Sequence, residues 1–140
     1  MNHNYASADI GCLVELADLE KAIKALNSEE PWVSVEVNGT KVEDLAVIGR
    51  RYWFEYHCWE SHESGDAKVW YHSHQQCVVL GFAKCDPCFF QTIQERGEAG
   101  HCLLYRVRFD DGLEWDVFED ELMDDQEQFC RPDPPPERKS

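Results

Sequence analysis

Residues 105–118 constrain the fold more than any other part of the chain, because two independent patterns in them select the same strand pairing. Apolar side chains alternate with polar ones in both halves of this segment, at Tyr105, Val107, Phe109, Leu113, Trp115 and Val117. The two apolar faces coincide only if Phe109 opposes Leu113, which predicts a hairpin with a three-residue loop and a positive φ angle at Gly112. The same register places opposite charges across the polar face, Arg106 against Asp116 and Arg108 against Glu114.

A second hairpin is predicted around Asn38-Gly39, the dipeptide preferred in two-residue type I′ turns. Alternating valines flank it, and the expected pairs are Val37 with Thr40, Glu36 with Lys41 and Val35 with Val42. Upstream, Leu16, Leu19, Ile23 and Leu26 recur at helical spacing and predict a helix that runs to about Asn27. Either Asp18 caps this helix or the helix begins near Gly11.

The middle of the chain predicts further strands. In residues 51–59, Tyr52, Phe54 and Tyr56 would face one way and Trp53, His57 and Trp59 the other. Residues 60–66 are polar and favour turns, so we expect the main internal boundary there. Strands are predicted at 68–71 and 77–82, a long loop at 84–100, and a short helical turn at 119–123.

The hairpin at 105–118, with the acidic turn that follows it to Leu122, resembles the third and fourth strands of SH3-like barrels of the Tudor type, notably chromatin-binding Tudor domains of DNA-repair adaptors. The resemblance covers about residues 66–129 and implies a five-stranded barrel, with 68–71 and 77–80 as its first two strands. Residues 1–60 resemble no family that we recognise.

We therefore expect an α+β fold: an antiparallel sheet with one N-terminal helix, followed by an SH3/Tudor-like β-barrel. The predicted parts are 1–62, a helix plus a small antiparallel sheet; 63–130, the barrel; and 131–140, a proline-rich flexible tail. Whether the barrel shares strands with the N-terminal part stays open at this point.

The resemblance also implies a site, because many Tudor domains bind methylated lysine or arginine in an aromatic cage. Phe109 and Asp111 occupy two cage positions, and Tyr71 or Trp70 could supply a third. Leu113 stands where such cages often have an aromatic residue, and Trp59 or Phe82 would have to supply the remaining walls. We therefore favour a cage that is filled or reused.

Acidity points to the class of partner. The 140 residues carry a formal charge of −15, and residues 110–127 hold ten acids and no basic residue. Such a chain is poorly suited to bind nucleic acid or anionic membranes, and no apolar run is long enough to cross a bilayer. We expect a surface that docks a basic protein or peptide segment, formed by Tyr71, Phe109, Asp111, Trp115, Glu119, Asp120 and Glu121.

The seven cysteines suggest a second hypothesis, a protein stabilised by zinc. No signal peptide is visible, so we expect reduced thiols and a cytoplasmic location. Cys85 and Cys88 form the one CxxC pair, and His101 and Cys102 could complete a zinc site, as could the His72-x-His74 pair. A second CxxC is missing, so the zinc signal is weak and our first expectation is no cofactor.

Catalytic motifs are not recognisable: the chain has no GxSxG, Walker A or GxGxxG sequence. We therefore expect a non-catalytic interaction module rather than an enzyme. The alternatives are the zinc-stabilised protein and a bacterial accessory or immunity-type protein whose acidity blocks a basic toxin or enzyme. The partner's identity and the oligomeric state stay open.

Overall fold

The computed structural model describes residues 15–26, 28–37, 39–58, 61–83 and 103–137. Two helices, seven strands and two 3₁₀ turns lie within these residues. They are α1 (Leu16–Ala25), β1 (Trp32–Val37), β2 (Thr40–Ala46), β3 (Arg51–Phe54), α2 (Ala67–Tyr71), β4 (Gln76–Phe82), β5 (Leu104–Phe109), β6 (Glu114–Phe118), η1 (Glu119–Glu121), β7 (Leu122–Met123) and η2 (Gln126–Gln128). None of the described helices is long and apolar enough to cross a membrane.

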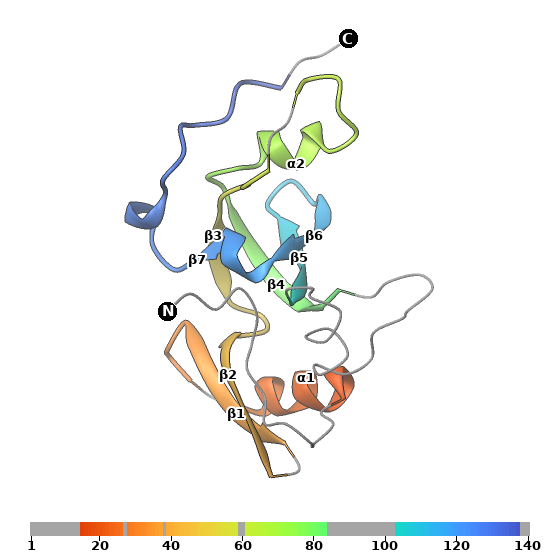
Figure 1. Cartoon of the computed structure of the whole chain (residues 1–140), viewed down its shortest axis with the longest axis vertical. Coiled ribbons are helices and arrows are strands. Elements are labelled where there is room, and N and C mark those ends of the chain that lie inside the picture. The colour runs from red at the N-terminus through yellow and green to blue at the C-terminus, as the bar shows by residue number, and fades with distance from the viewer. Residues whose placement is uncertain (1–14, 27, 38, 59–60, 84–102, 138–140) are drawn as a thin grey trace.

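The strands form two antiparallel sheets, which confirms the predicted α+β class. β1 and β2 make a hairpin that lies beside α1, and the other strands form a five-stranded sheet of order β6-β5-β4-β3-β7 (Figure 1). The sheets are open, and a closed barrel is not seen among the described strands. β3 precedes the predicted boundary at residues 62 and 63, so the larger sheet draws on both sides of it.

Both predicted hairpins have the expected register. In β5–β6, Arg108 pairs with Glu114 and Arg106 with Asp116, and Gly112 has a φ angle of 93°. In β1–β2, the three predicted pairs are found and Gly39 has a φ angle of 82°. Local alternation and turn residues were sufficient to predict both pairings.

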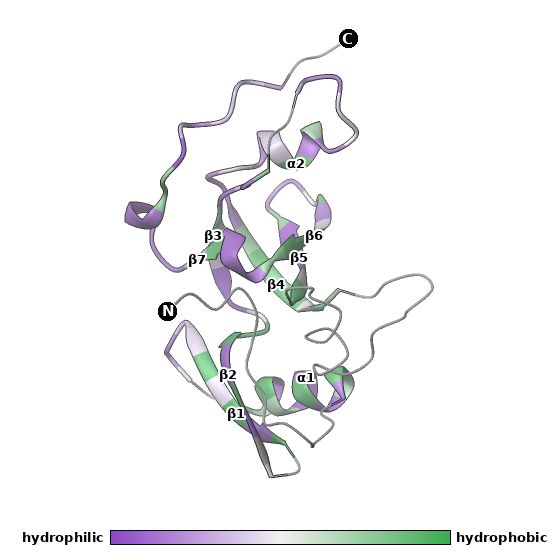
Figure 2. Ribbon diagram, in the orientation of Figure 1, coloured by the Kyte–Doolittle hydropathy of each residue, from purple (hydrophilic) through white to green (hydrophobic). Residues whose placement is uncertain are grey.

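The helix α1 buries one face, as the apolar spacing predicted. Leu16, Leu19 and Ile23 are buried, whereas Leu26 lies beyond the last helical residue and is exposed. In Figure 2, apolar and polar residues alternate along this helix. The expected cap at Asp18 is wrong, because Glu15 precedes the helix and Asp18 lies in its first turn. The alternative start near Gly11 falls outside the described residues.

The strand predicted at 68–71 is wrong: these residues belong to α2. β4 has β3 on one edge and β5 on the other, so a strand at 68–71 has no edge of β4 left to pair with. The short helix instead buries Ala67 and Val69. β3 is also shorter than predicted and ends at Phe54, although Tyr56 beyond it is still buried.

One hydrophobic core joins the two sheets and α1. Two buried tyrosines link them with polar bonds: the Ala46 N–H donates to the Tyr105 hydroxyl at 3.1 Å, and the Val47 N–H donates to the Tyr52 hydroxyl at 2.7 Å. Burial raises the pKa of both phenols. The hydroxyls therefore stay neutral and act as hydrogen-bonding groups within the core.

The helix α1 also contacts the sheet through a bulge in β4. The β4–β5 register shifts between Val79 and Gly81, and the Phe82 N–H donates to Glu20 Oε1 of α1 at 3.0 Å. A Cβ atom at Gly81 would lie 2.2 Å from that same oxygen. Glycine is therefore the residue that lets the carboxylate reach the strand.

We predict that Gly81→Ala lowers the free energy of unfolding by about 1 kcal/mol, because the Glu20 side chain must move away and its hydrogen bond is lost. Urea denaturation measures this. In a Glu20→Ala background the same change should cost clearly less. Gly65→Ala is the matched control, since a Cβ at Gly65 meets nothing within 4 Å. An equal cost with and without Glu20 would contradict this account.

Candidate functional site

The predicted cage position Phe109 lies in the core rather than in an open pocket. Its exposed fraction is 2%, and its ring contacts Phe54 and His72 at centroid distances of 5.4 and 4.7 Å. Trp115, half-buried on β6, pairs with Val107 and packs against the same core. These two residues therefore serve packing in this structure.

Asp111, the predicted carboxylate of the cage, ties the β5–β6 turn to the end of α2. Its Oδ2 lies 2.7 Å from Nε2 of His72, and its Oδ1 accepts the Leu113 N–H at 3.0 Å. The bond from Leu113, together with His72, lowers the pKa of Asp111. The carboxylate is exposed but already has partners.

The acids at 119–121 divide between the interior and the surface. Glu119 and Glu121 are buried, and Asp120 is exposed. Glu121 accepts the N–H groups of His57 and Phe118, each at 3.0 Å. Burial is the main cause that raises the pKa of both glutamates, to about 8 for Glu119. Other acids of the predicted block pair with arginines: Asp110, Glu114 and Asp116.

An aromatic and acidic pocket lies between the segment after β3 and the C-terminal tail. Its volume is about 540 Å³, and among the residues that line it are Tyr56, His62, Glu63, Trp70, Arg131 and Asp133. We call it the aromatic pocket. The predicted site residue Tyr71 contacts two of these: its hydroxyl shares a 2.7 Å hydrogen bond with His62 Nδ1, and its ring stacks on Trp70.

The C-terminal tail forms one wall of this pocket. Sequence analysis predicted a flexible tail, whereas Pro132, Pro134 and Pro135 line the pocket together with Asp133. Asp133 Oδ1 lies 2.8 Å from His74 Nδ1. The tail therefore contributes both apolar surface and a carboxylate.

Beside the pocket, Glu55 is a fully buried carboxylate with an exposed fraction of 0%. Its Oε1 accepts the N–H of Cys130 at 3.0 Å and the thiol of Cys130 at 3.3 Å. Its Oε2 accepts the N–H of Arg131 at 3.0 Å and lies 2.6 Å from Nε2 of His74. Phe129 stacks on the His74 ring at a centroid distance of 4.0 Å.

Burial by itself would raise the pKa of Glu55, but the hydrogen bonds from Cys130, His74 and Arg131 outweigh it and lower the pKa to about 2. Glu55 is therefore ionised at neutral pH. Its nearest charged or titratable neighbours include His57, whose Nε2 lies 3.5 Å from Oε1. Glu55 thus brings an ionised carboxylate close to imidazole and thiol groups inside the protein.

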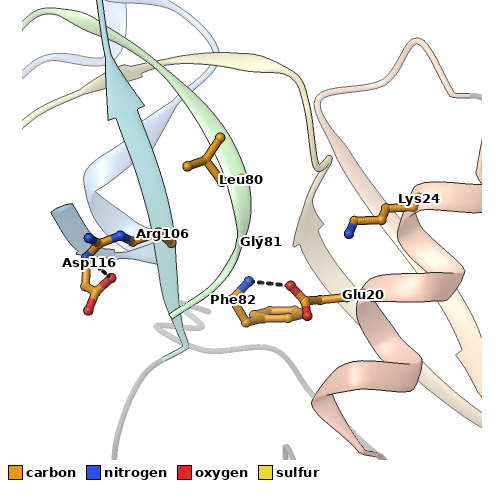
Figure 3. Close-up of a pocket in the computed structure, with 7 residues that line it drawn as sticks. All are labelled: Glu20, Lys24, Leu80, Gly81, Phe82, Arg106 and Asp116. Carbon is orange, nitrogen blue, oxygen red and sulfur yellow. Dashed lines mark hydrogen bonds and ion pairs between the residues drawn. The ribbon is translucent and has the colours of Figure 1, made fainter. Parts of the chain in front are cut away.

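A second cavity of about 470 Å³ lies between α1 and the larger sheet. Figure 3 shows Glu20 and Lys24 on one side, and Arg106 bonded to Asp116 on the other. Its lining carries both signs of charge, and Glu20 is held by the Phe82 N–H. This cavity therefore has no charge preference that points to one class of ligand.

The predicted zinc ligands Cys85, Cys88, His101 and Cys102 lie outside the described residues, so that site stays a prediction. The His72-x-His74 pair does not converge, since His72 binds Asp111 and His74 binds Glu55 and Asp133. Among the described residues, the ligand atoms of three potential metal-binding side chains come within 4.8 Å of one another at one place, Glu55, His57 and Cys130.

Sequence reasoning missed Glu55, His74 and Cys130 as a unit, because 75 positions separate Glu55 from Cys130. One sign was present. An acid stands between Phe54 and Tyr56, in a segment whose aromatic residues are predicted to lie on both faces of a strand. A charged residue in such a run indicates a buried carboxylate with partners.

No family model, no curated protein and no solved structure matches the chain.

We predict that Glu55→Gln lowers the free energy of unfolding by about 2–4 kcal/mol, because the amide brings an NH₂ group against buried donors and removes the charge that they stabilise. Urea denaturation at neutral pH measures the loss. Glu127→Gln, an exposed change in η2, should shift stability by less than about 0.5 kcal/mol. Equal effects of the two variants would contradict the buried role of Glu55.

We predict that Glu119→Gln raises the free energy of unfolding at pH 8 by roughly 1–3 kcal/mol. The folded-state pKa of Glu119 is about 8, above the ordinary value of 4.5. The folded chain therefore holds the proton more tightly, and stability falls as pH rises from 4.5 to 8. The variant should lose this slope and match the parent near pH 4.5. Asp124→Asn, at an exposed acid that is not among the causes of this shift, is the control and should keep the slope.

Proposed function

We propose that the protein is a non-catalytic interaction module that binds a basic segment of a partner protein in the aromatic pocket. The observation that carries this proposal is the lining of the pocket, where Tyr56, His62 and Trp70 stand with Glu63 and Asp133. Aromatic faces attract cations through their quadrupole, and a carboxylate adds a charge-assisted hydrogen bond. The combination favours a lysine or arginine side chain.

The size of the pocket supports the same class of ligand. At about 540 Å³ it falls within the range of about 300–1,000 Å³ in which proteins hold small ligands. Arg131 is already one of its lining residues, and its Nη1 donates to the Cys58 carbonyl at 3.5 Å. Glu63 and Asp133 together carry one charge more than Arg131, so the lining keeps a net negative charge for the cation of a partner.

The overall charge supports a basic partner as well. A chain at −15 attracts cationic segments over a distance set by the ionic strength. Asp120, Asp124 and Glu127 are exposed after β6 and add to this field. They would speed the encounter, whereas the pocket would supply the specific contact.

We also infer that the larger sheet is an opened relative of the SH3-like barrel. The sheet has five strands, and a 3₁₀ turn comes directly before the last of them, as in such barrels. The first strand of the barrel would be β3 rather than residues 68–71. The cage would then have moved from the β5–β6 turn to the segment that follows β3.

The test is a titration with a short lysine- and arginine-rich peptide, followed by NMR. We predict that the indole signal of Trp70 shifts and that Trp70→Leu weakens binding about 10-fold, because the largest cation-binding face is lost. Trp32→Leu is the matched control, since Trp32 lies on β1 and is partly buried against Tyr52. Binding should also weaken as salt is raised from low to physiological concentration.

A methylated form of the same peptide separates cage recognition from charge alone. Tighter binding of the trimethyl-lysine peptide would indicate a cage, and equal binding a general cation site. The proposal fails if millimolar peptide leaves the signals around Trp70 unchanged, or if Trp32→Leu weakens binding as much as Trp70→Leu.

A further inference from the structure

Three side chains beside the aromatic pocket present one oxygen, one nitrogen and one sulfur atom to a common point. Sγ of Cys130 lies 3.3 Å from Glu55 Oε1, and Nε2 of His57 lies 3.5 Å from the same oxygen. All three atoms are within 4.8 Å of one another. Ligands of a tetrahedral zinc ion, with bonds of about 2.0–2.3 Å, are themselves about 3.3–3.6 Å apart. Two of the three separations therefore already have the required length.

The electrostatics of the cluster favour a cation. Nε2 of His57 is buried and has no hydrogen-bond partner among the described residues, although it faces Glu55. The described side chains in contact with the Glu55 carboxylate belong to His57, His74 and Cys130, and none of them is a lysine or an arginine. The ionised carboxylate of Glu55 and the ring nitrogen of His57, which has no hydrogen-bond partner in the described part of the chain, are both ligands that a transition-metal ion accepts. We propose that Glu55, His57 and Cys130 bind a divalent transition-metal ion, with zinc as the best fit to this donor set.

The surrounding bonds hold the three ligands in place. His74 and the Arg131 N–H bind the outer oxygen, Oε2, of Glu55, which leaves Oε1 directed at the cluster. Glu121 binds the backbone N–H of His57. Such outer contacts orient metal ligands and raise affinity.

Binding replaces one proton by the metal. The Cys130 thiol, which now donates to Glu55 Oε1, loses its proton to solvent, and the sulfur and the oxygen both coordinate the ion. One thiolate, one carboxylate and a neutral imidazole with Zn²⁺ have zero net charge. Water completes the tetrahedron. The ion thereby joins the segment after β3 to the segment after η2.

This site goes beyond the proposed function and does not depend on it. It shares no residue with the predicted CxxC site, so the test removes that pair. The full chain carrying Cys85→Ser and Cys88→Ser is titrated with zinc, and with cobalt to detect a thiolate-to-metal charge-transfer band. We expect one equivalent to bind. Adding Cys130→Ser should weaken metal binding at least about 100-fold and abolish the charge-transfer band. Loss of a residue that only orients a ligand costs less than this. Adding Cys58→Ser, at another exposed cysteine, should change neither.

A second measurement needs no substitution in the cluster. In the parent chain, zinc should slow alkylation of Cys130 at least about 10-fold and leave Cys58 unaffected, as read by peptide mass spectrometry. This readout holds even if Cys130→Ser fails to fold. The proposal is overturned if the Cys85→Ser/Cys88→Ser chain binds no metal, if Cys130→Ser binds as tightly as its parent, or if zinc leaves the alkylation rate of Cys130 unchanged.

Discussion

The buried charge of Glu55 is the constraint on which much of the structure depends. A carboxylate with no exposed surface must be compensated within the protein, and donors converge on it from His74, Cys130 and Arg131. The backbone N–H of Glu55 in turn donates to the carbonyl of Glu121 at 2.9 Å. The segments before β4 and after η2 are thereby held against the end of β3.

These bonds also explain why the aromatic pocket exists where it does. Arg131 and Asp133 belong to a tail that would have little reason to stay near Trp70 without the contacts at Glu55 and His74. The pocket is therefore a product of the buried network, because the network positions one of its walls. A metal ion at Glu55 would strengthen the same attachment.

The acidity of the chain has two distinct roles in this arrangement. Glu55, Glu119 and Glu121 lie in the interior, where Glu55 and Glu121 organise backbone N–H groups and Glu119 weakens the fold at high pH. Asp120 and Asp124 face solvent, where they contribute to the field that a basic partner meets. A count of charges alone does not separate these roles, because burial depends on contacts that are distant in the sequence.

Both hairpins follow from the sequence by itself, since parity, charge pairing and a glycine with positive φ all act over fewer than about 15 residues. The buried face of α1 follows in the same way. The tertiary structure decided that residues 67–71 form the helix α2 rather than a strand, because β3 and β5 already occupy both edges of β4. It also decided that Phe109 fills the core and that Glu55 meets Cys130 across 75 positions. Local patterns select a conformation for a segment, whereas a site is formed by segments whose proximity only the packed chain determines.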